Sequence, residues 1–111
     1  MIAKVETVFI KTYKLEEAAQ WYKTVFKLPI KWSNERAIAF EAGETDLTIV
    51  EETTFTPLPD AAFTLFAQDI DAFYNHLVKQ QVETSTVQVW EHIRYLSFQD
   101  PAGNHLQVCQ Y

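Results

Sequence analysis

One pattern of periodicity occurs twice along this chain of 111 residues, and it restricts the possible folds more than any other feature of the sequence. Residues 4–12 have the two-residue period of a strand, and residues 14–27 change to the spacing of an amphipathic helix that Pro29 ends. Three shorter strands are predicted after this helix, at residues 30–33, 36–42 and 45–51. The first half of the chain therefore has the predicted order β-α-β-β-β.

A linker and a second copy of the same order follow. Residues 53–60 contain two prolines among polar side chains, which predicts an extended segment without helix or strand. After it come a predicted strand at 62–67 and a predicted helix at 70–80, for which Asp69 is a suitable N-cap. The remaining predicted strands cover residues 82–90, 93–99 and 104–110.

These two modules, residues 1–52 and 61–111, predict a single α+β domain that covers residues 1–111. The expected architecture is two βαβββ modules forming a curved mixed sheet, a half-open barrel, with the helices on its convex face. The concave side between two structural halves is where small ligands usually bind.

The composition narrows the class of partner. The net charge of −6 disfavours DNA and RNA, because binding to their phosphates depends on lysine and arginine. Charged residues interrupt the first 20 positions, so neither a signal peptide nor a membrane-spanning helix is predicted, and no membrane partner is expected. The single cysteine, Cys109, cannot form an internal disulfide, which suits a reducing compartment, and a cytoplasmic location is expected.

Two segments resemble motifs of the vicinal oxygen chelate superfamily, which includes glyoxalases, bleomycin resistance proteins and extradiol dioxygenases. Residues 15–22 (LEEAAQWY) resemble its first-helix motif, although glycine is usual in the family where Lys27 stands. Residues 98–106 (FQDPAGNHL) resemble a second motif of the superfamily near the end of the domain, in which two strands are joined by an Asp-Pro-x-Gly-Asn turn. Trp90 lies shortly upstream, as an aromatic residue often does in the bleomycin-resistance branch. Because both modules fit, the resemblance covers essentially the whole chain and implies the family's fold.

The resemblance also locates the positions at which metal-dependent members of the superfamily hold a divalent cation. Those positions are occupied here by Thr7, Thr48, Ala62 and Gln107. Divalent cations need several imidazole or carboxylate donors, and two hydroxyls, a methyl group and one amide do not provide them. No metal, no other cofactor and no catalytic residue is therefore expected.

Strand periodicity extends this placement to the rest of the implied cavity. If the four positions face the concave side, alternate residues of the same strands face it too. The predicted ligand-binding residues are Thr7, Phe9, Thr48, Thr64, Phe66, Trp90, Tyr95, His105 and Gln107. The opposite faces, which include Leu47 and Leu106, are uniformly apolar, as packing under two helices requires. This mixture of aromatic and hydrogen-bonding side chains is typical of a site for a small, partly apolar organic molecule.

The sequence favours a metal-independent small-molecule binding protein of the glyoxalase/bleomycin-resistance type over an enzyme. Its expected partners are a small organic molecule of unknown identity and, from the family resemblance, a second copy of the chain in a homodimer. Two alternatives stay open. One is a metal-dependent lyase or isomerase resembling glyoxalase I, with ligands relocated to His105, Gln107 and Glu51. The other is a ligand-free structural or regulatory domain, in which the same aromatic residues only fill the interior.

Overall fold

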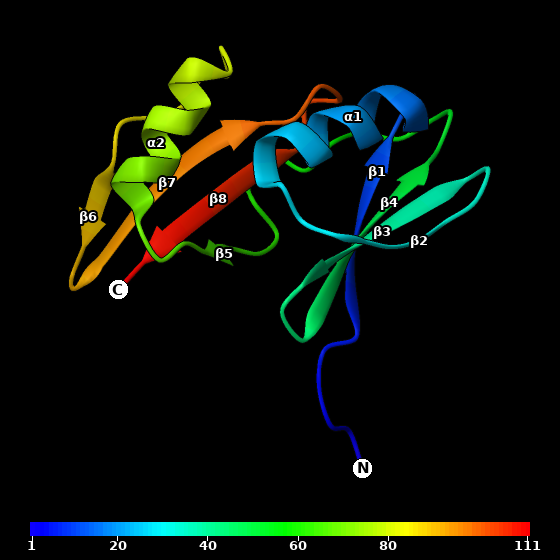
Figure 1. Ribbon diagram of the computed structural model, residues 1–111, viewed down its shortest axis with the longest axis horizontal. Coiled ribbons are helices and arrows are strands. Elements are labelled where there is room, and N and C mark those ends of the chain that lie inside the picture. Colours follow the sequence, from blue (N-terminus) through cyan, green and yellow to red (C-terminus); the bar gives the residue numbers. More distant parts are fainter. The chain divides into compact units, whose positions relative to one another are not determined.

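The computed structural model describes residues 1–111 and contains two compact units, unit 1 at Met1–Thr56 and unit 2 at Pro57–Tyr111 (Figure 1). Unit 1 contains β1 (Thr7–Thr12), α1 (Leu15–Phe26), β2 (Ile30–Ser33), β3 (Ala37–Ala42) and β4 (Thr45–Glu51). Unit 2 contains β5 (Leu65–Phe66), α2 (Ile70–Lys79), β6 (Gln88–Trp90), β7 (Ile93–Gln99) and β8 (His105–Gln110). The predicted order β-α-β-β-β is therefore confirmed in both halves.

Each unit forms a four-stranded mixed sheet, and the two sheets have the same topology. The strand order is β1-β4-β3-β2 in unit 1 and β5-β8-β7-β6 in unit 2, so the first strand of each unit pairs with the last. That pair is parallel, and the other neighbouring strands are antiparallel. Parallel strands need a long connection, and the helix of each unit lies in it. The predicted α+β class with two βαβββ modules is confirmed.

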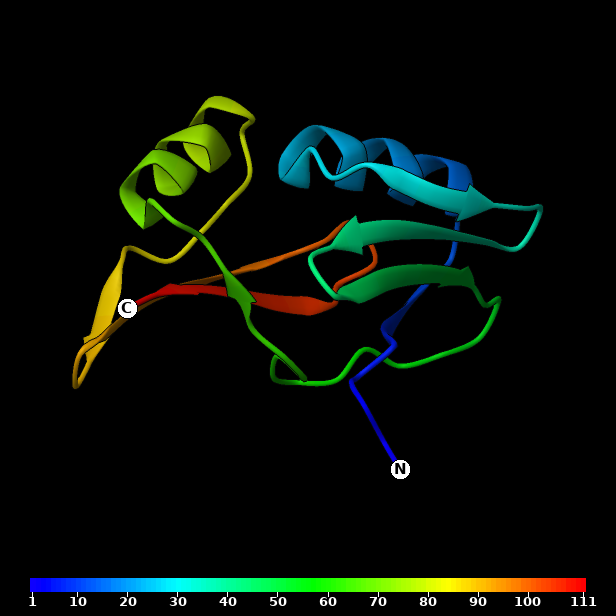
Figure 2. The same ribbon diagram turned by 60° about the horizontal axis from the view of Figure 1, so that its bottom comes forward.

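Helix α1 covers one face of its sheet because its apolar residues recur at helical spacing. Ala18, Tyr22 and Val25 are buried, and the helix lies against β3 and β4 (Figure 2). The ring of Tyr22 lies 6.4 Å from that of Phe40, which is fully buried, as is Leu47. Each such side chain contributes roughly 1.5–3 kcal/mol to stability by leaving water. The side of the sheet that carries Phe40 and Leu47 is therefore the helix-covered face of unit 1.

Helix α2 covers one face of the sheet in unit 2 in the same way. Ile70 and Leu77 are buried, and the ring of Phe73 lies 6.0 Å from that of Phe98 on β7. The periodicity also predicts Val78 on this apolar face, which is wrong, because Val78 is 53% exposed. One residue turns a helix by about 100°, so Val78 is carried to the side of α2 once Leu77 faces the sheet.

Two strands are shorter than the sequence predicts. Of residues 62–67 only two pair with β8, and of residues 82–90 only β6 and a bridge at Thr84 pair with β7. Next to Thr84, a side-chain hydroxyl takes one hydrogen bond that a regular ladder would make. Ser85 Oγ accepts from the Ser97 N–H at 3.0 Å, while the Ser85 backbone N–H still donates to the Ser97 carbonyl at 2.9 Å. Such side-chain bonds compete with regular strand pairing.

The ends of the two helices are made differently. The predicted N-cap of α2 is confirmed, because the Asp69 side chain accepts a hydrogen bond of 3.0 Å from the Ala72 N–H. Lys14 precedes α1 and provides no side-chain cap. At its other end α1 stops at Lys27, whose φ of 54° is the left-handed conformation that favours glycine.

Neither α1, of 12 residues, nor α2, of 10, has the length and apolar character needed to cross a membrane.

The turn between β7 and β8 is held by one buried carboxylate. Asp100 accepts hydrogen bonds from the backbone N–H groups of Ala102 and Asn104, at 3.0 and 2.9 Å, and from the Asn104 side-chain amide at 2.8 Å. Gly103 has a φ of 90°, which residues with a side chain rarely adopt. The Asp, Gly and Asn of the family-like motif are thus each required by the geometry of this turn, which places His105 opposite Gln99.

Candidate functional site

In each unit one face of the sheet is not covered by the helix of that unit. In unit 2 the buried side chains of Leu96 and Leu106 mark the helix-covered face, and because residues alternate along a strand, the intervening side chains lie on the other face. The predicted site residues on this helix-free face of unit 2 are Phe66, Trp90, Tyr95, His105 and Gln107. Thr64 lies immediately before β5, and its hydroxyl donates a hydrogen bond of 3.4 Å to the Gln107 carbonyl.

The strand register of unit 2 brings the aromatic members of this set to one end of the face. Phe66 lies beside Cys109, and Cys109 lies beside Tyr95 on the next strand. Trp90 lies on the edge strand β6, where Gln88, two residues before it, is the partner of Tyr95. Phe66 and Trp90 are 54% and 62% exposed, so their rings are available for contact.

Tyr111 belongs to the same end of this face, although the sequence-based prediction omits it. Its ring lies 4.9 Å from that of Phe66, and the residue is 75% exposed. A signal for it exists in the sequence, because Tyr111 continues the alternation of His105, Gln107 and Cys109 beyond the end of β8.

In unit 1 the structure brings together Thr7, Phe9 and Thr48 on the helix-free face. Phe9 is the partner of Thr48 in the register of β1 and β4, and it is 68% exposed. The hydroxyl oxygens of Thr7 and Thr48 are 2.6 Å apart, and Thr7 Oγ1 also donates to the Asp46 carbonyl at 3.0 Å. These are the two positions of unit 1 that the family resemblance assigns to metal ligands, and here their side chains hydrogen-bond to each other.

A charged pair lies on the same face of unit 1, and the sequence-based prediction omits it. Lys31 Nζ and Asp46 Oδ2 are 3.0 Å apart, and the Asp46 side chain is 10% exposed. The hydrogen bond to Asp46 and the charge of Asp46 raise the pKa of Lys31; desolvation opposes this, and Glu6 and Glu41 add smaller contributions. The pair has no sequence signal, because only the strand order brings β2 and β4 near each other.

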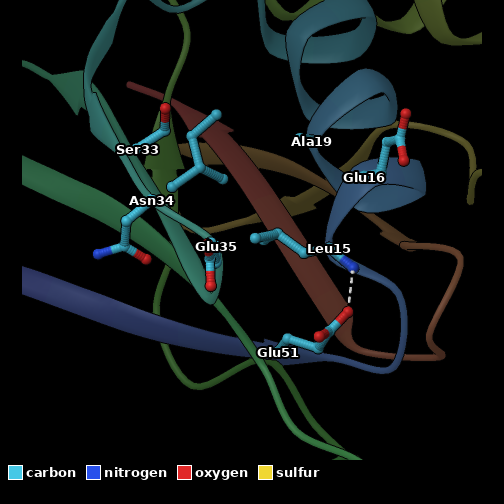
Figure 3. A pocket seen from close by; sticks show the side chains of 8 residues that line it. Leu15, Glu16, Ala19, Ser33, Asn34, Glu35 and Glu51 are labelled. Carbon is cyan, nitrogen blue, oxygen red and sulfur yellow. Dashed lines mark hydrogen bonds between the residues drawn. The ribbon is translucent and has the colours of Figure 1, made fainter.

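A pocket of about 410 Å³ lies elsewhere in unit 1, where the start of α1 approaches the end of β2 (Figure 3). Its lining includes the carboxylates of Glu16, Glu35 and Glu51 and none of the predicted site residues. The Glu51 carboxylate already accepts a hydrogen bond of 3.0 Å from the Leu15 N–H, as Figure 3 shows. No group of three His, Cys, Asp or Glu side chains is placed to hold a metal ion, here or elsewhere in residues 1–111. This pocket and the helix-free faces are therefore separate features.

Solved structures of several functions are similar to this chain, while no curated protein sequence matches it. TnmS3, an antibiotic binding protein from Streptomyces sp. CB03234, has a TM-score of 0.87 and 21% identity, with 98% of this chain and 96% of that one covered. A lactoylglutathione lyase from Agrobacterium tumefaciens has a TM-score of 0.82 and 17% identity, with 98% and 94% covered. Oxidase ChaP-H2 has a TM-score of 0.80 and 11% identity, with 100% and 95% covered.

At these identities the likeness shows a shared fold and not a shared activity. The sequence provides the evidence for the family itself, because a family model matches residues 4–108, which is nearly the whole chain. The resemblance in the first helix and in the Asp100–Asn104 turn is thereby confirmed. The chain belongs to the Glyoxalase/Bleomycin resistance protein/Dioxygenase superfamily.

Proposed function

We propose that this protein is a metal-independent small-molecule binding protein whose ligand lies against a helix-free sheet face. The candidate contacts, each face taken by itself, are Thr7, Phe9 and Thr48 in unit 1, and Thr64, Phe66, Trp90, Tyr95, His105 and Gln107 in unit 2. The set in unit 1 has one exposed aromatic ring, that of Phe9, and the set in unit 2 has those of Phe66 and Trp90; both sets also contain hydrogen-bonding groups. Sites for small organic molecules usually have this mixture of apolar walls and a few polar groups.

The observation that carries the proposal is the hydrogen bond between Thr7 and Thr48. Their hydroxyl oxygens are 2.6 Å apart, at positions that the family resemblance assigns to metal ligands. Zinc, iron and manganese are held in proteins by imidazole, thiolate and carboxylate groups. The other two positions, Ala62 and Gln107, add only a methyl group and one amide. This donor set does not fit a catalytic divalent metal.

A metal-dependent lyase or isomerase would need relocated ligands, and Glu51 is the carboxylate considered for that role. In unit 1, Glu51 follows Leu47 and Ile49 at two-residue spacing, so its side chain lies on the helix-covered face, opposite to Thr48. Its Oε1 accepts a hydrogen bond of 3.0 Å from the Leu15 N–H. Because this carboxylate caps α1, its position supports the binding protein over the enzyme.

The similar structures include a protein named for binding an antibiotic as well as a lyase and an oxidase. One fold therefore serves both binding and catalysis, and the side chains at the site decide between them. The proposal that this chain binds a small molecule without converting it follows from its own donor set.

Calorimetric titration of the metal-stripped protein with Ni²⁺, Zn²⁺, Mn²⁺ and Fe²⁺ tests the first half of the proposal, and we expect no stoichiometric binding. A thermal-shift screen of organic compounds in EDTA tests the second half. A ligand at a hundred times its Kd raises the free energy of unfolding by about 2.7 kcal/mol. Tight binding of one metal ion per chain, lost in His105→Ala, would overturn the proposal in favour of the enzyme. A screen without any ligand would favour a structural or regulatory domain.

The proposal includes a homodimer in the cytoplasm. Ile30 and Trp32, on the edge strand β2, remain 45% and 43% exposed, and burial against a second copy would remove them from water. Cys109 is buried and unpaired, which suits a reducing compartment. Sedimentation equilibrium tests the assembly, and a mass of one chain at micromolar concentration would reject the dimer.

A further inference from the structure

The helix-free face of unit 2 changes character along the length of its strands. At one end Phe66, Cys109 and Tyr95 lie side by side on β5, β8 and β7. The ring of Tyr111 lies 4.9 Å from that of Phe66, and Trp90 is on the adjoining edge strand β6. Phe66 and Tyr95 therefore flank a small buried thiol, and a planar apolar group can stack on the aromatic rings at this end of the face.

The other end of the same face is polar. Gln107 and His105 precede Cys109 on β8. Their partners on the neighbouring strand β7 are Ser97 and Gln99, respectively. At about 3.3 Å per residue, Gln107 lies roughly 7 Å and His105 roughly 13 Å from Cys109. Gln107 and His105 are half-buried, yet neither side chain makes a hydrogen bond within the protein. Their donors and acceptors are therefore available to a ligand.

Among the residues of β5, β6, β7 and β8 that alternation places on this face, none is Asp, Glu, Lys or Arg. Arg94, next to Tyr95 in the chain, lies on the helix-covered side and pairs with Asp71. A charged ligand group would give up water here without gaining an opposite charge, which is unfavourable. A neutral hydrogen-bonding group avoids this penalty.

We propose that this face selects a neutral amphipathic molecule, with an aromatic ring system stacked at Phe66, Trp90 and Tyr95 and a polar group bound by Gln107 or His105. This assignment rests on the proposed small-molecule binding function and names its ligand class. The roughly 7 Å from Cys109 to Gln107 is within reach of a short polar arm on a two-ring system, and His105 suits a longer arm.

Compounds that share one ring system separate the contribution of ring stacking from that of the polar group and from that of its charge. They are naphthalene, 1-naphthaleneacetamide, 1-naphthaleneacetate and 1-naphthylmethylammonium. Binding to the metal-stripped full chain is followed by ¹H–¹⁵N NMR in EDTA, at one fixed pH for all the compounds. The amide is expected to bind about tenfold more tightly than the acetate or the ammonium compound. The shifts should centre on the backbone amides of Phe66, Tyr95 and Gln107.

Substitutions at the two ends of the face should have different effects. Trp90→Ala should weaken all the compounds by about fivefold, because it removes a stacking ring. Gln107→Leu should reduce the preference for the amide over naphthalene to about unity without weakening naphthalene; Gln107→Ala repeats the test if the leucine variant does not fold. Val89→Ala is the matched control, since Val89 adjoins Trp90 on β6, is 69% exposed and lies on the opposite side.

The outcomes separate this assignment from the function on which it rests. If the acetate or the ammonium compound binds as tightly as the amide, or if the shifts fall only in residues 1–56, the ligand class is wrong and small-molecule binding still stands. If none of the four binds while the EDTA screen yields another ligand, the assignment alone is overturned. If neither experiment yields a ligand, the proposed function fails together with it.

Discussion

The backbone N–H of Leu15 donates a hydrogen bond of 3.0 Å to the carboxylate of Glu51, so the last residue of β4 caps the start of α1. The topology explains this contact, because Thr12 at the end of β1 is the partner of Glu51 and the helix begins shortly afterwards. Unit 2 repeats it with a neutral group, since Gln110 at the end of β8 accepts a hydrogen bond of 2.8 Å from the Ile70 N–H. The same position of the repeat therefore caps the helix in both units.

Removal of the Glu51 cap is expected to destabilise the protein. Glu51→Ala leaves the Leu15 N–H without its acceptor and should lower the free energy of unfolding by about 1–2 kcal/mol, since Lys14 supplies no substitute. Glu51→Gln keeps an acceptor oxygen, as in Gln110, and should lose only about 0.3–1 kcal/mol of charge–dipole attraction. Urea unfolding measures both variants, and equal losses would show that the hydrogen bond is not what stabilises the helix.

A single substitution at the C-terminal end of α1 is expected to stabilise the protein. Lys27 has a φ of 54°, and its N–H donates to the Lys23 carbonyl. This conformation costs a residue with a side chain roughly 1–2 kcal/mol, and glycine avoids most of that cost. Lys27→Gly should therefore raise the free energy of unfolding by about 1 kcal/mol and the Tm by about 4 °C. Lys27→Ala is the control; a thermal melt in which alanine stabilises as much as glycine would assign the gain to the lost charge.

A double-mutant cycle with valine, which has the shape of threonine, tests the hydrogen bond between Thr7 and Thr48. Thr48 is buried, with 4% exposed, so Thr7→Val leaves its hydroxyl without that partner and should cost about 1–3 kcal/mol. Thr48→Val should cost less, because Thr7 still donates to the Asp46 carbonyl. The double variant should lose less than the sum of the two single variants. Additive losses in urea unfolding would mean that the two hydroxyls do not interact.

The pair of Lys31 and Asp46 should make stability depend on pH in the alkaline range. The pKa of Lys31 is raised in the folded state, first by its hydrogen bond to Asp46 and then by the charge of Asp46. A raised pKa gives stabilisation that is fully present below the ordinary lysine value of about 10.4 and is lost as the pH rises through the folded value. The stability advantage of the wild type over Lys31→Gln should therefore shrink above about pH 10.4 in urea unfolding.

The control for this experiment is Lys23→Gln, because Lys23 is an exposed lysine in the last turn of α1. This variant also removes one lysine charge, but it leaves the ion pair of Lys31 and Asp46 in place. An advantage of the wild type over Lys31→Gln that stayed constant up to about pH 12 would contradict the role given to the ion pair.

The parts of the structure predicted correctly from the sequence depend on residues a few positions apart. The Asp69 cap bonds to Ala72, and the Asp100 carboxylate bonds to groups no further along the chain than Asn104. The prediction of a continuous strand at 82–90 failed where side-chain and backbone hydrogen bonds compete, because Ser85 Oγ accepts the hydrogen bond of the Ser97 N–H that a regular ladder with β7 would use. Tyr111 was missed because it lies beyond the last strand.

The sequence by itself determined the repeated β-α-β-β-β order, the apolar face of each sheet and the family to which the chain belongs. Only the tertiary structure decided which side chains meet: Thr7 with Thr48, 41 positions apart, Lys31 with Asp46, and Leu15 with Glu51. The physical reason is that alternation along a strand assigns a residue to a face, whereas its neighbour on that face depends on strand order and register. Those are set by pairing between distant segments, and a shift of one residue would exchange the two faces.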